Sequence, residues 1–303
     1  MKVAFFGNVC NNFYALAKSL RRNGVADAHL YLHDKADIQN RPESDDPALT
    51  NGYPDWIHMS PLWDPFVFLK KWDRTFIREL NKYDVVFLSD LGVLLAPYIK
   101  SKKIFFVTGG DLTRIPFAER YMAEVTGWKA WFTRRYVSLM QRRGIRCCDM
   151  IISQPFLPFS SALERIGVQK TKISSSYYPI LIDADSIKCG SLSVLDIDPV
   201  NKERLAPFKF IVFHPSRLFI TAREHFVEMG VWKGNDNLFK GFALFLNNYD
   251  VKDACLAMPE RIYSPDIDLA RNIISELGIS DQVVWLKPTT EEGFPRNELI
   301  KYY

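Results

Sequence analysis

The first 24 residues, MKVAFFGNVCNNFYALAKSLRRNG, give the clearest indication of the architecture. Val3–Phe6 is a continuous apolar run, which is typical of a strand that is buried on both faces of a parallel sheet. The turn that follows leads into apolar residues at helical spacing, namely Phe13, Leu16, Ala17 and Leu20. Gly24 can end that helix. The stretch therefore predicts a strand, a tight turn and a helix, which is the repeating unit of an α/β fold.

The same alternation continues to about residue 153. Further strands are predicted at Ala28–Leu32, Val85–Leu88, Ile104–Val107 and Met150–Ser153, and helices at 66–80 and 132–140. Residues 33–64 are rich in Pro, Asp and Asn without a sustained period, which is typical of a functional or mobile loop. Strands that alternate with helices predict a parallel sheet.

A second α/β region follows a change in composition. Residues 181–206 collect Asp, Ser and Pro, as an interdomain linker does. Strands are then predicted at Phe210–Phe213, Ala254–Met258 and Val283–Leu286, and helices at 238–246 and 267–277. We expect a first domain at 1–180, a linker at 181–206 and a second domain at 207–303. The second sheet is expected to be incomplete, because fewer than about 100 residues are left for it.

The composition excludes several classes of function. A net charge of +4 is too small to predict nucleic-acid binding. The five cysteines form no CxxC pair and no zinc-type spacing with histidine, so we expect reduced thiols and no metal centre. No apolar run reaches the roughly 20 residues that span a bilayer, which predicts a cytoplasmic protein.

The turn after the first strand is a candidate binding site. Ligands of open α/β sheets bind beyond the carboxyl ends of the strands, next to helix N-termini. Gly7 lets a ligand approach the backbone, and Asn8, Asn11 and Asn12 offer donors and acceptors. The turn does not match GxGxxG, so a dehydrogenase loses its main support. A tight turn with an Asn helix cap explains the same residues equally well.

The loop Thr108-Gly109-Gly110-Asp111-Leu112, after the strand Ile104–Val107, is a second candidate. Gly110 can expose backbone N–H groups, and Asp111 can accept hydrogen bonds from substrate hydroxyls. The alternative is a glycine turn with Asp111 as the cap of a helix. We favour binding, because this carboxylate follows the end of a strand rather than lying on an exposed helix.

Basic residues at the start of the second region form the third candidate. Arg217 follows the strand Phe210–Phe213, and Lys233-Gly234 precedes a long helix. A guanidinium, an ammonium and a helix N-terminus together suit a diphosphate. They would stabilise the charge that develops on a departing diphosphate. The site is not a P-loop, and two solvated cations near a turn are the alternative interpretation.

Two segments resemble a known family. The run from Arg217 through Lys233-Gly234-Asn235-Asp236-Asn237-Leu238-Phe239 resembles the donor-binding segment of retaining GT-B glycosyltransferases of family 4. The opening Phe6-Gly7-Asn8-Val9-Cys10-Asn11-Asn12-Phe13 and the loop Thr108–Leu112 resemble loops of a sugar-transferase subset of that family. The resemblance extends over nearly the whole chain, although each motif is short.

The resemblance implies two Rossmann-like domains that face a cleft, with the acceptor bound mainly by the first and a nucleotide-sugar by the second. Arg217, Lys233 and Gly234 would bind the donor diphosphate. Gly7, Asn8, Asn11, Asn12, Gly110 and Asp111 would line the acceptor side. The donor is a co-substrate, and neither a cofactor nor a metal is implied.

Three departures from the family pattern are visible. Many relatives carry a His at the position of Gly109-Gly110, and the stretch from Arg217 to Lys233 is longer than usual. The family's paired glutamates would fall beyond Tyr303, since Glu291 and Glu292 come too early. The catalytic residue is therefore not assigned, and the chain is expected to be a truncated or degenerate member.

The leading hypothesis is a glycosyltransferase that transfers a sugar from a nucleoside diphosphate sugar to a glycan or lipid-linked acceptor with retention. The alternatives are a nucleotide-sugar-binding module without turnover, or another GT-B-type enzyme such as a sugar epimerase. Residues 128–146 combine Trp, Phe and clustered Arg. That pattern fits contact with the inner face of a membrane, but we favour an ordinary helix with a solvated basic face, because a charged outer face needs no special explanation.

Overall fold

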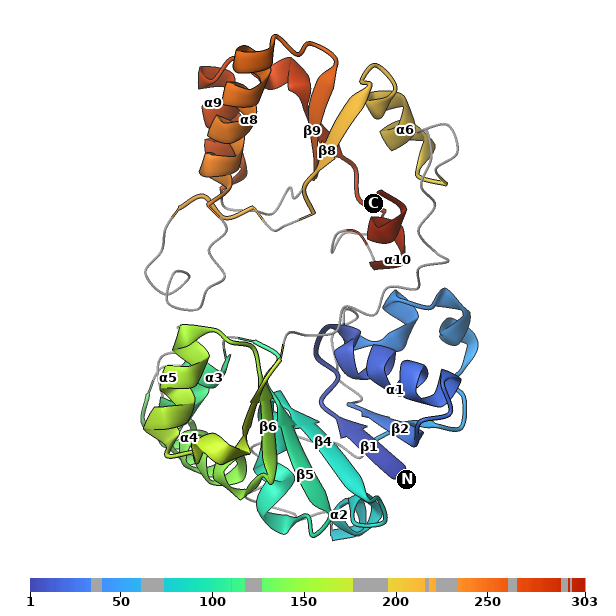
Figure 1. Cartoon of the computed structure of the whole chain (residues 1–303), viewed down its shortest axis with the longest axis vertical. Helices are drawn as coiled ribbons and strands as arrows, with labels where there is room; N and C mark the ends of the chain where they lie inside the picture. Colours follow the sequence, from blue (N-terminus) through green and yellow to red (C-terminus); the bar gives the residue numbers. More distant parts are fainter. Residues whose placement is uncertain are drawn as a thin grey trace. The chain divides into compact units, whose positions relative to one another are not determined.

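The computed structural model describes residues 1–33, 40–60, 74–109, 111–117, 127–176, 196–215, 218–221, 234–260, 266–289, 294 and 296–302. The chain divides into two compact units, Met1–Leu181 and Ile182–Tyr303. Each unit has its own parallel sheet (Figure 1).

The first unit is built on a seven-stranded parallel sheet in the order β3-β2-β1-β4-β5-β6-β7. Its strands are β1 (Lys2–Phe6), β2 (Asp27–Leu32), β3 (Ile57–Met59), β4 (Val85–Ser89), β5 (Lys102–Phe106), β6 (Met150–Ser153) and β7 (Ile173–Ser175). The sheet confirms the predicted α/β class. The two outer strands, β3 and β7, were not predicted, because three-residue strands are too short to show a period.

The helices of this unit are α1 (Asn12–Arg22), α2 (Arg74–Leu80), α3 (Asp111–Arg114), α4 (Trp128–Cys147) and α5 (Leu157–Ile166). The described part of this unit also contains the 3-10 segments η1 (Val9–Asn11), η3 (Pro42–Ser44), η4 (Pro47–Asn51), η6 (Asp90–Tyr98), η7 (Ile115–Phe117) and η8 (Lys170–Lys172). The loop expected at 33–64 therefore contains β3 and two of these segments. No helix in the described parts of the chain has the length and apolar character needed to cross a bilayer.

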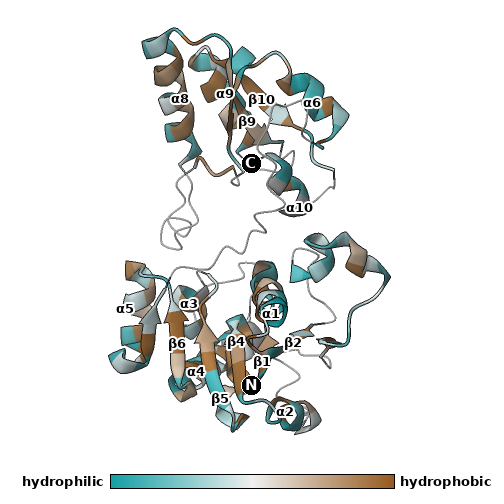
Figure 2. Cartoon of the chain, turned by 45° about the vertical axis from the view of Figure 1, so that its right-hand side comes forward, coloured by the Kyte–Doolittle hydropathy of each residue, from teal (hydrophilic) through white to brown (hydrophobic). Residues whose placement is uncertain are grey.

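Strand β1 is an inner strand of the sheet, and its side chains contribute to two cores. Ala4 and Phe6 belong to the apolar cluster on one face, and Val3 and Phe5 belong to the cluster on the other. This alternation follows from the two-residue period of a strand. It confirms the double burial predicted from the apolar run, and Figure 2 shows the central strands largely in the colour of hydrophobic residues.

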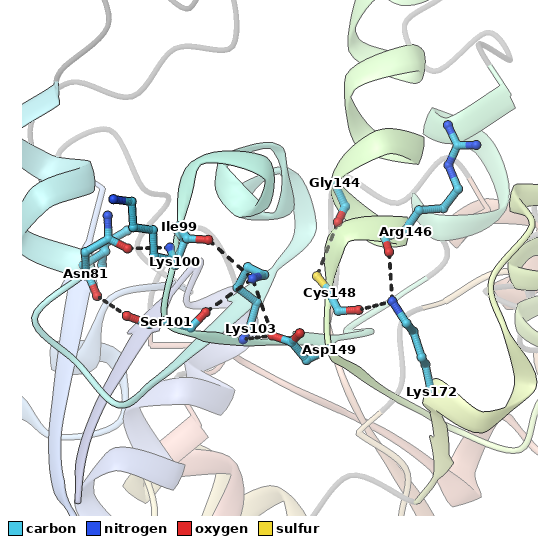
Figure 3. A network of polar contacts seen from close by, with 11 residues as sticks. Asn81, Ile99, Lys100, Ser101, Lys103, Gly144, Arg146, Cys148, Asp149 and Lys172 are labelled. Atoms are coloured by element: carbon cyan, nitrogen blue, oxygen red, sulfur yellow. Dashed lines mark hydrogen bonds and ion pairs between the residues drawn. The ribbon is translucent and has the colours of Figure 1, made fainter.

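The edge where the strands of the first sheet begin, called the amino edge here, is closed by side chains that bond to the main chain (Figure 3). Lys103 Nζ donates to Ile99 O at 3.3 Å, and its main-chain N–H donates to the Asp149 carboxylate at 2.7 Å. Lys172 Nζ donates to Arg146 O and Cys148 O, the last carbonyls around the end of α4, at 3.2 and 2.9 Å. These bonds satisfy carbonyls that a helix end leaves without partners.

The Cys148 thiol belongs to the same network. Burial raises its pKa to about 12, so the thiol stays protonated at neutral pH. Its Sγ donates to Gly144 O at 3.4 Å. Cys148 is thus a structural residue of the amino edge rather than a reactive one.

The second unit contains a three-stranded parallel sheet in the order β10-β9-β8. Its described elements are α6 (Pro199–Leu205), β8 (Phe210–Phe213), α8 (Asn235–Tyr249), β9 (Ala254–Pro259), α9 (Ile267–Glu276), η11 (Ser280–Gln282), β10 (Val283–Leu286), α10 (Arg296–Leu299) and η12 (Ile300–Tyr302). The strands and long helices predicted here are confirmed. The central strand β9 is buried along its whole length.

Helix α6 lies in the range that was expected as a linker. The Asp198 side chain caps it by accepting from Val200 N and Asn201 N, and Pro199 occupies its first turn. Leu205 packs in the core formed by β9 and β10. Packing of the second unit therefore begins upstream of residue 207. The Asp and Pro that suggested a linker are in fact the start signals of a short helix.

Candidate functional site

The carboxyl ends of the strands in the first sheet form what we call the carboxyl edge, and the turn after β1 lies at its centre. Gly7 has φ +96°, and Ser89 Oγ, at the end of the neighbouring β4, donates to Gly7 O. A Cβ on residue 7 would lie 2.7 Å from Ser89 O. Two backbones therefore meet here at a distance that only glycine allows. Ser89 was not predicted, although its place after the strand Val85–Leu88 was a usable signal.

Asn8 and Asn11 form a buried amide pair inside this turn. Asn8 Nδ2 donates to Asn11 Oδ1 at 2.6 Å, and Asn8 Oδ1 accepts from Tyr14 N at 2.9 Å. Asn11 Nδ2 donates to Arg41 O at 2.7 Å, and Asn11 is only 1% exposed. The predicted ligand-binding side chains are thus used inside the protein. They hold the turn against the segment 40–46, whereas Asn12 lies half-buried in the first turn of α1.

The segment 40–46 is fixed a second time by an ion pair. Asp46 accepts from Tyr14 OH and from Lys18 Nζ, both at 3.0 Å. Burial raises the pKa of Asp46, but the bonds from Lys18 and Tyr14 outweigh it and hold that pKa below its usual range. Burial and the Asp46 bond raise the pKa of the Tyr14 phenol. Asp46 is therefore a stable anion at neutral pH and a firm anchor for the segment.

Backbone strain gathers at the carboxyl edge. Cys10 and Asn11 in the turn after β1, and Asp90 directly after β4, have φ of 49°, 55° and 48°. Most L-residues, Cys10 among them, adopt this left-handed region at a cost of about 1–2 kcal/mol, whereas Asn and Asp adopt it more readily. Strain of this kind persists where the surrounding structure enforces it, and it is common at functional sites. The edge is therefore the candidate site of the first unit.

The loop after β5 reaches the same edge, since β5 lies next to β4 and Phe106 is paired with Ser89. Thr108 and Gly109 are half-buried, and a Cβ on Gly109 would meet no atom within 4 Å. Asp111 begins α3, in agreement with a helix start at this position. Gly110 lies outside the described residues.

In the second unit, the connection from β8 to α8 is held by a buried frame. Asn235 is fully buried in the first turn of α8. Its Oδ1 accepts a hydrogen bond from Phe219 N at 2.8 Å, and its Nδ2 lies 3.0 Å from His214 Nε2. Asp266, just before α9, accepts from Ile220 N at 2.9 Å and from Thr221 Oγ1 at 2.9 Å. The segment 218–221 is therefore fixed at both ends. Asp266 was not predicted, because it caps a distant segment rather than its own helix.

Gly234 precedes α8 in the left-handed conformation, with φ 56° and ψ 43°. It is buried, and α8 is long enough for its N-terminus to favour an anion. Arg217 and Lys233 lie outside the described residues, so their place in a diphosphate site stays a prediction. Within the described parts of both units, no three His, Cys, Asp or Glu side chains gather as metal ligands would.

Comparison with known proteins shows what this architecture is similar to. No protein-family profile matches the chain, and no curated protein matches its sequence. HepE of Anabaena in complex with UDP-glucose matches with a TM-score of 0.53 at 13% identity, covering 100% of this chain and 71% of that one. A glycosyltransferase of Rickettsia africae matches with a TM-score of 0.50 at 14% identity, covering 100% and 70%. At such low identity these matches show the fold, which is GT-B-like.

Proposed function

We propose that this chain is a retaining glycosyltransferase, similar to family 4, that uses a nucleoside diphosphate sugar and a glycan or lipid-linked acceptor. The GT-B-like fold supports a sugar transferase, and HepE was solved with UDP-glucose. The observation that carries the proposal is the frame around the β8–α8 connection. Asn235 and Asp266 hold the short segment between Arg217 and the residues that lead to Lys233.

The donor side of the reaction follows from the chemistry of these residues. We assign the diphosphate of the donor to Arg217, Lys233 and the N-terminus of α8. Gly234 has no side chain that would keep a phosphate away from the first N–H groups of the helix. The planar guanidinium of Arg217 suits two phosphate oxygens, and Lys233 adds a point charge.

In the proposed reaction the bond between the anomeric carbon and the diphosphate oxygen breaks. The leaving nucleoside diphosphate takes the electron pair, and Arg217 and Lys233 stabilise the charge that it gains. An acceptor hydroxyl oxygen forms the new glycosidic bond, and its proton passes to the departing diphosphate oxygen or to solvent water. With retention, the new bond lies on the same face of the sugar as the old one.

The acceptor side is assigned to the carboxyl edge of the first sheet. Gly7, Gly110 and Asp111 remain the proposed contacts, while Asn8 and Asn11 act as positioning residues that fix the turn. We propose that no cofactor or metal takes part, and that the protein works in the cytoplasm.

Calorimetric titration of the full chain with a panel of nucleoside diphosphate sugars tests the donor site. We expect one class of nucleotide to bind, and Arg217→Ala and Lys233→Ala each to weaken binding at least about tenfold, as loss of a charge-assisted contact does. Lys252→Ala is the matched control, because it removes a cation that is 85% exposed on a turn after α8.

Three outcomes separate the hypotheses. Sugar transfer to an acceptor, with the anomeric configuration of the product retained by NMR, supports the full proposal. Binding without transfer or donor hydrolysis would reduce the chain to a nucleotide-sugar-binding module. Binding that is equal in the wild type, Arg217→Ala and Lys233→Ala would remove the proposed donor site.

A further inference from the structure

Helix α4 (Trp128–Cys147) has a buried face that fixes it on the first unit. Ser138 Oγ donates to Pro116 O at 2.5 Å, and a Cβ on Gly144 would lie 2.1 Å from Val93 O in η6. Val137, Met140 and Ile145 lie on the same side and are buried. The orientation of the helix about its axis is therefore settled by packing.

The opposite face of α4 is exposed and strongly apolar. Trp128 is 76% exposed, and Trp131, Phe132 and Leu139 are 53–54% exposed. With 3.6 residues per turn, these four side chains fall within roughly 100° of arc. Soluble surfaces seldom expose so many large apolar side chains together, so this face is expected to bind something.

Arginine shares the same stripe. Arg135, Arg143 and Arg146 are exposed on it, and the Arg135 guanidinium lies 4.9 Å from the centre of the Trp131 ring. The helix sequence WKAWFTRRYVSLMQRRGIRC holds six Lys and Arg and no Asp or Glu. The whole chain has a net charge of +4, so without α4 it would be acidic. An ordinary solvated face mixes both signs of charge, and this one does not.

We propose that the exposed face of α4 binds the surface of a bilayer that carries anionic lipid headgroups. Trp and Phe favour the interface between headgroups and acyl chains, and Arg binds the lipid phosphates beside them. Leu139 lacks the aromatic ring that stacks on bases and is instead suited to the acyl-chain boundary of a bilayer. The stripe therefore fits a surface that is apolar beneath an anionic layer.

The position of the stripe links the membrane contact to the acceptor of the proposed glycosyltransferase. This link rests on the proposed function, whereas the membrane contact itself does not. Because α4 ends just before β6, its Trp128 end lies at the carboxyl edge of the first sheet. Phe156, 37% exposed, and Leu157, 76% exposed, lie at the start of α5, after β6 and thus at the same edge. The bilayer contact would hold the acceptor side next to the headgroups, where the sugar of a lipid-linked acceptor lies.

Sedimentation of the full chain with vesicles tests the contact. We expect binding to vesicles of phosphatidylcholine with roughly a third phosphatidylglycerol, and little binding to pure phosphatidylcholine. The double variant Arg135→Glu/Arg143→Glu should weaken binding at least about tenfold, as should Trp128→Ala/Trp131→Ala/Phe132→Ala. The matched controls lie in the second unit. Lys209→Glu/Lys252→Glu reverses two exposed positive charges, and Leu244→Ala/Tyr249→Ala removes two exposed apolar side chains.

A second measurement does not depend on any variant. Binding of the wild-type chain to the anionic vesicles should fall as NaCl rises from about 0.1 to 1 M, because salt screens exposed charges. Equal binding to both kinds of vesicle, or equal losses in the control variants, would overturn the proposal. So would tighter binding to an RNA oligonucleotide that displaces the vesicles. Nucleotide-sugar binding by Arg135→Glu/Arg143→Glu is expected to be unchanged, which separates this inference from the donor site.

Discussion

The two edges of the first sheet are built by opposite rules. At the amino edge, the left-handed conformations fall on Gly24 and Gly167, which end α1 and α5. Lys103 and Lys172 complete the hydrogen bonds there. At the carboxyl edge, positive φ falls on Gly7 but also on Cys10, Asn11 and Asp90, although glycine would adopt these conformations at no steric cost.

The difference separates a structural edge from a candidate site. Where only stability matters, local sequence and local conformation agree, as they do at Gly24 and Gly167. A residue type that does not suit its backbone conformation is most often found where a protein binds a ligand or catalyses a reaction. Cys10, whose residue type does not favour this conformation, is therefore the clearest local indication of a candidate site at the carboxyl edge of the first unit.

The largest expected effect is that of Gly7→Ala. A Cβ would meet Ser89 O at 2.7 Å, in addition to the positive φ, so we expect a loss of about 3 kcal/mol in the stability of the first unit. Hydrogen exchange of β1 and β4 in the full chain measures it. Gly24→Ala is the control, because its φ is +63° but its Cβ meets nothing within 4 Å, so it should cost about 1 kcal/mol. Equal losses would show that the close approach to Ser89 has no weight.

Asn11→Ala is expected to come next, with a loss of about 2 kcal/mol. The change removes the buried bonds of the Asn11 side chain with Asn8 Nδ2, Arg41 O and Ser44 Oγ, which tie the turn to the segment 40–46. Faster hydrogen exchange of residues 40–46 is the readout. Asn12→Ala, in the neighbouring half-buried position, should stay within about 0.5 kcal/mol. Unchanged exchange at 40–46 would contradict the role of Asn11 as the anchor of that segment.

Lys172→Met tests the amino edge, with an expected loss of about 1 kcal/mol. It removes two bonds from an ammonium to the carbonyls of Arg146 and Cys148. The effect should appear in the exchange of the last turn of α4 and should not reach the segment 40–46. Lys170→Met removes the same charge from an exposed neighbour and should have no measurable effect.

Cys10→Gly is expected to have the smallest effect on the stability of the first unit, and to stabilise it rather than destabilise it. It relieves the φ of +49°, and this gain exceeds the entropy that glycine loses, so we expect a stabilisation of about 0.5 kcal/mol. The thermal midpoint of the first unit measures it. Cys10→Ser keeps the strain and removes the thiol, so it should leave the midpoint unchanged. A rise of the same size in both variants would trace the effect to the thiol.

The sequence predicted those parts of the fold whose signal is local. Val3–Phe6 and the helix from Asn12 were predicted because an apolar run and a helical period are visible in one short window. The roles of Asn8, Asn11 and Asp266 could not be predicted in this way, because each of these side chains also bonds to a main-chain group that lies 30 to 46 residues away in the sequence. Amide side chains in a turn have the same sequence signature whether they bind a ligand or another loop. Arg217, Lys233 and Gly110 are outside the described residues, and their assignment still rests on the resemblance.

The anchoring of the turn to residues 40–46 also sets the order in which this edge can assemble. Local helix formation cannot shape the turn, since Asn8 and Asn11 need Asn40 and Arg41, which follow β2 in the chain. Contacts between distant segments form after local ones, because the chain must first close the loop between them. The carboxyl edge is therefore expected to mature late in folding. Substitutions there should accelerate unfolding while leaving the folding rate nearly unchanged.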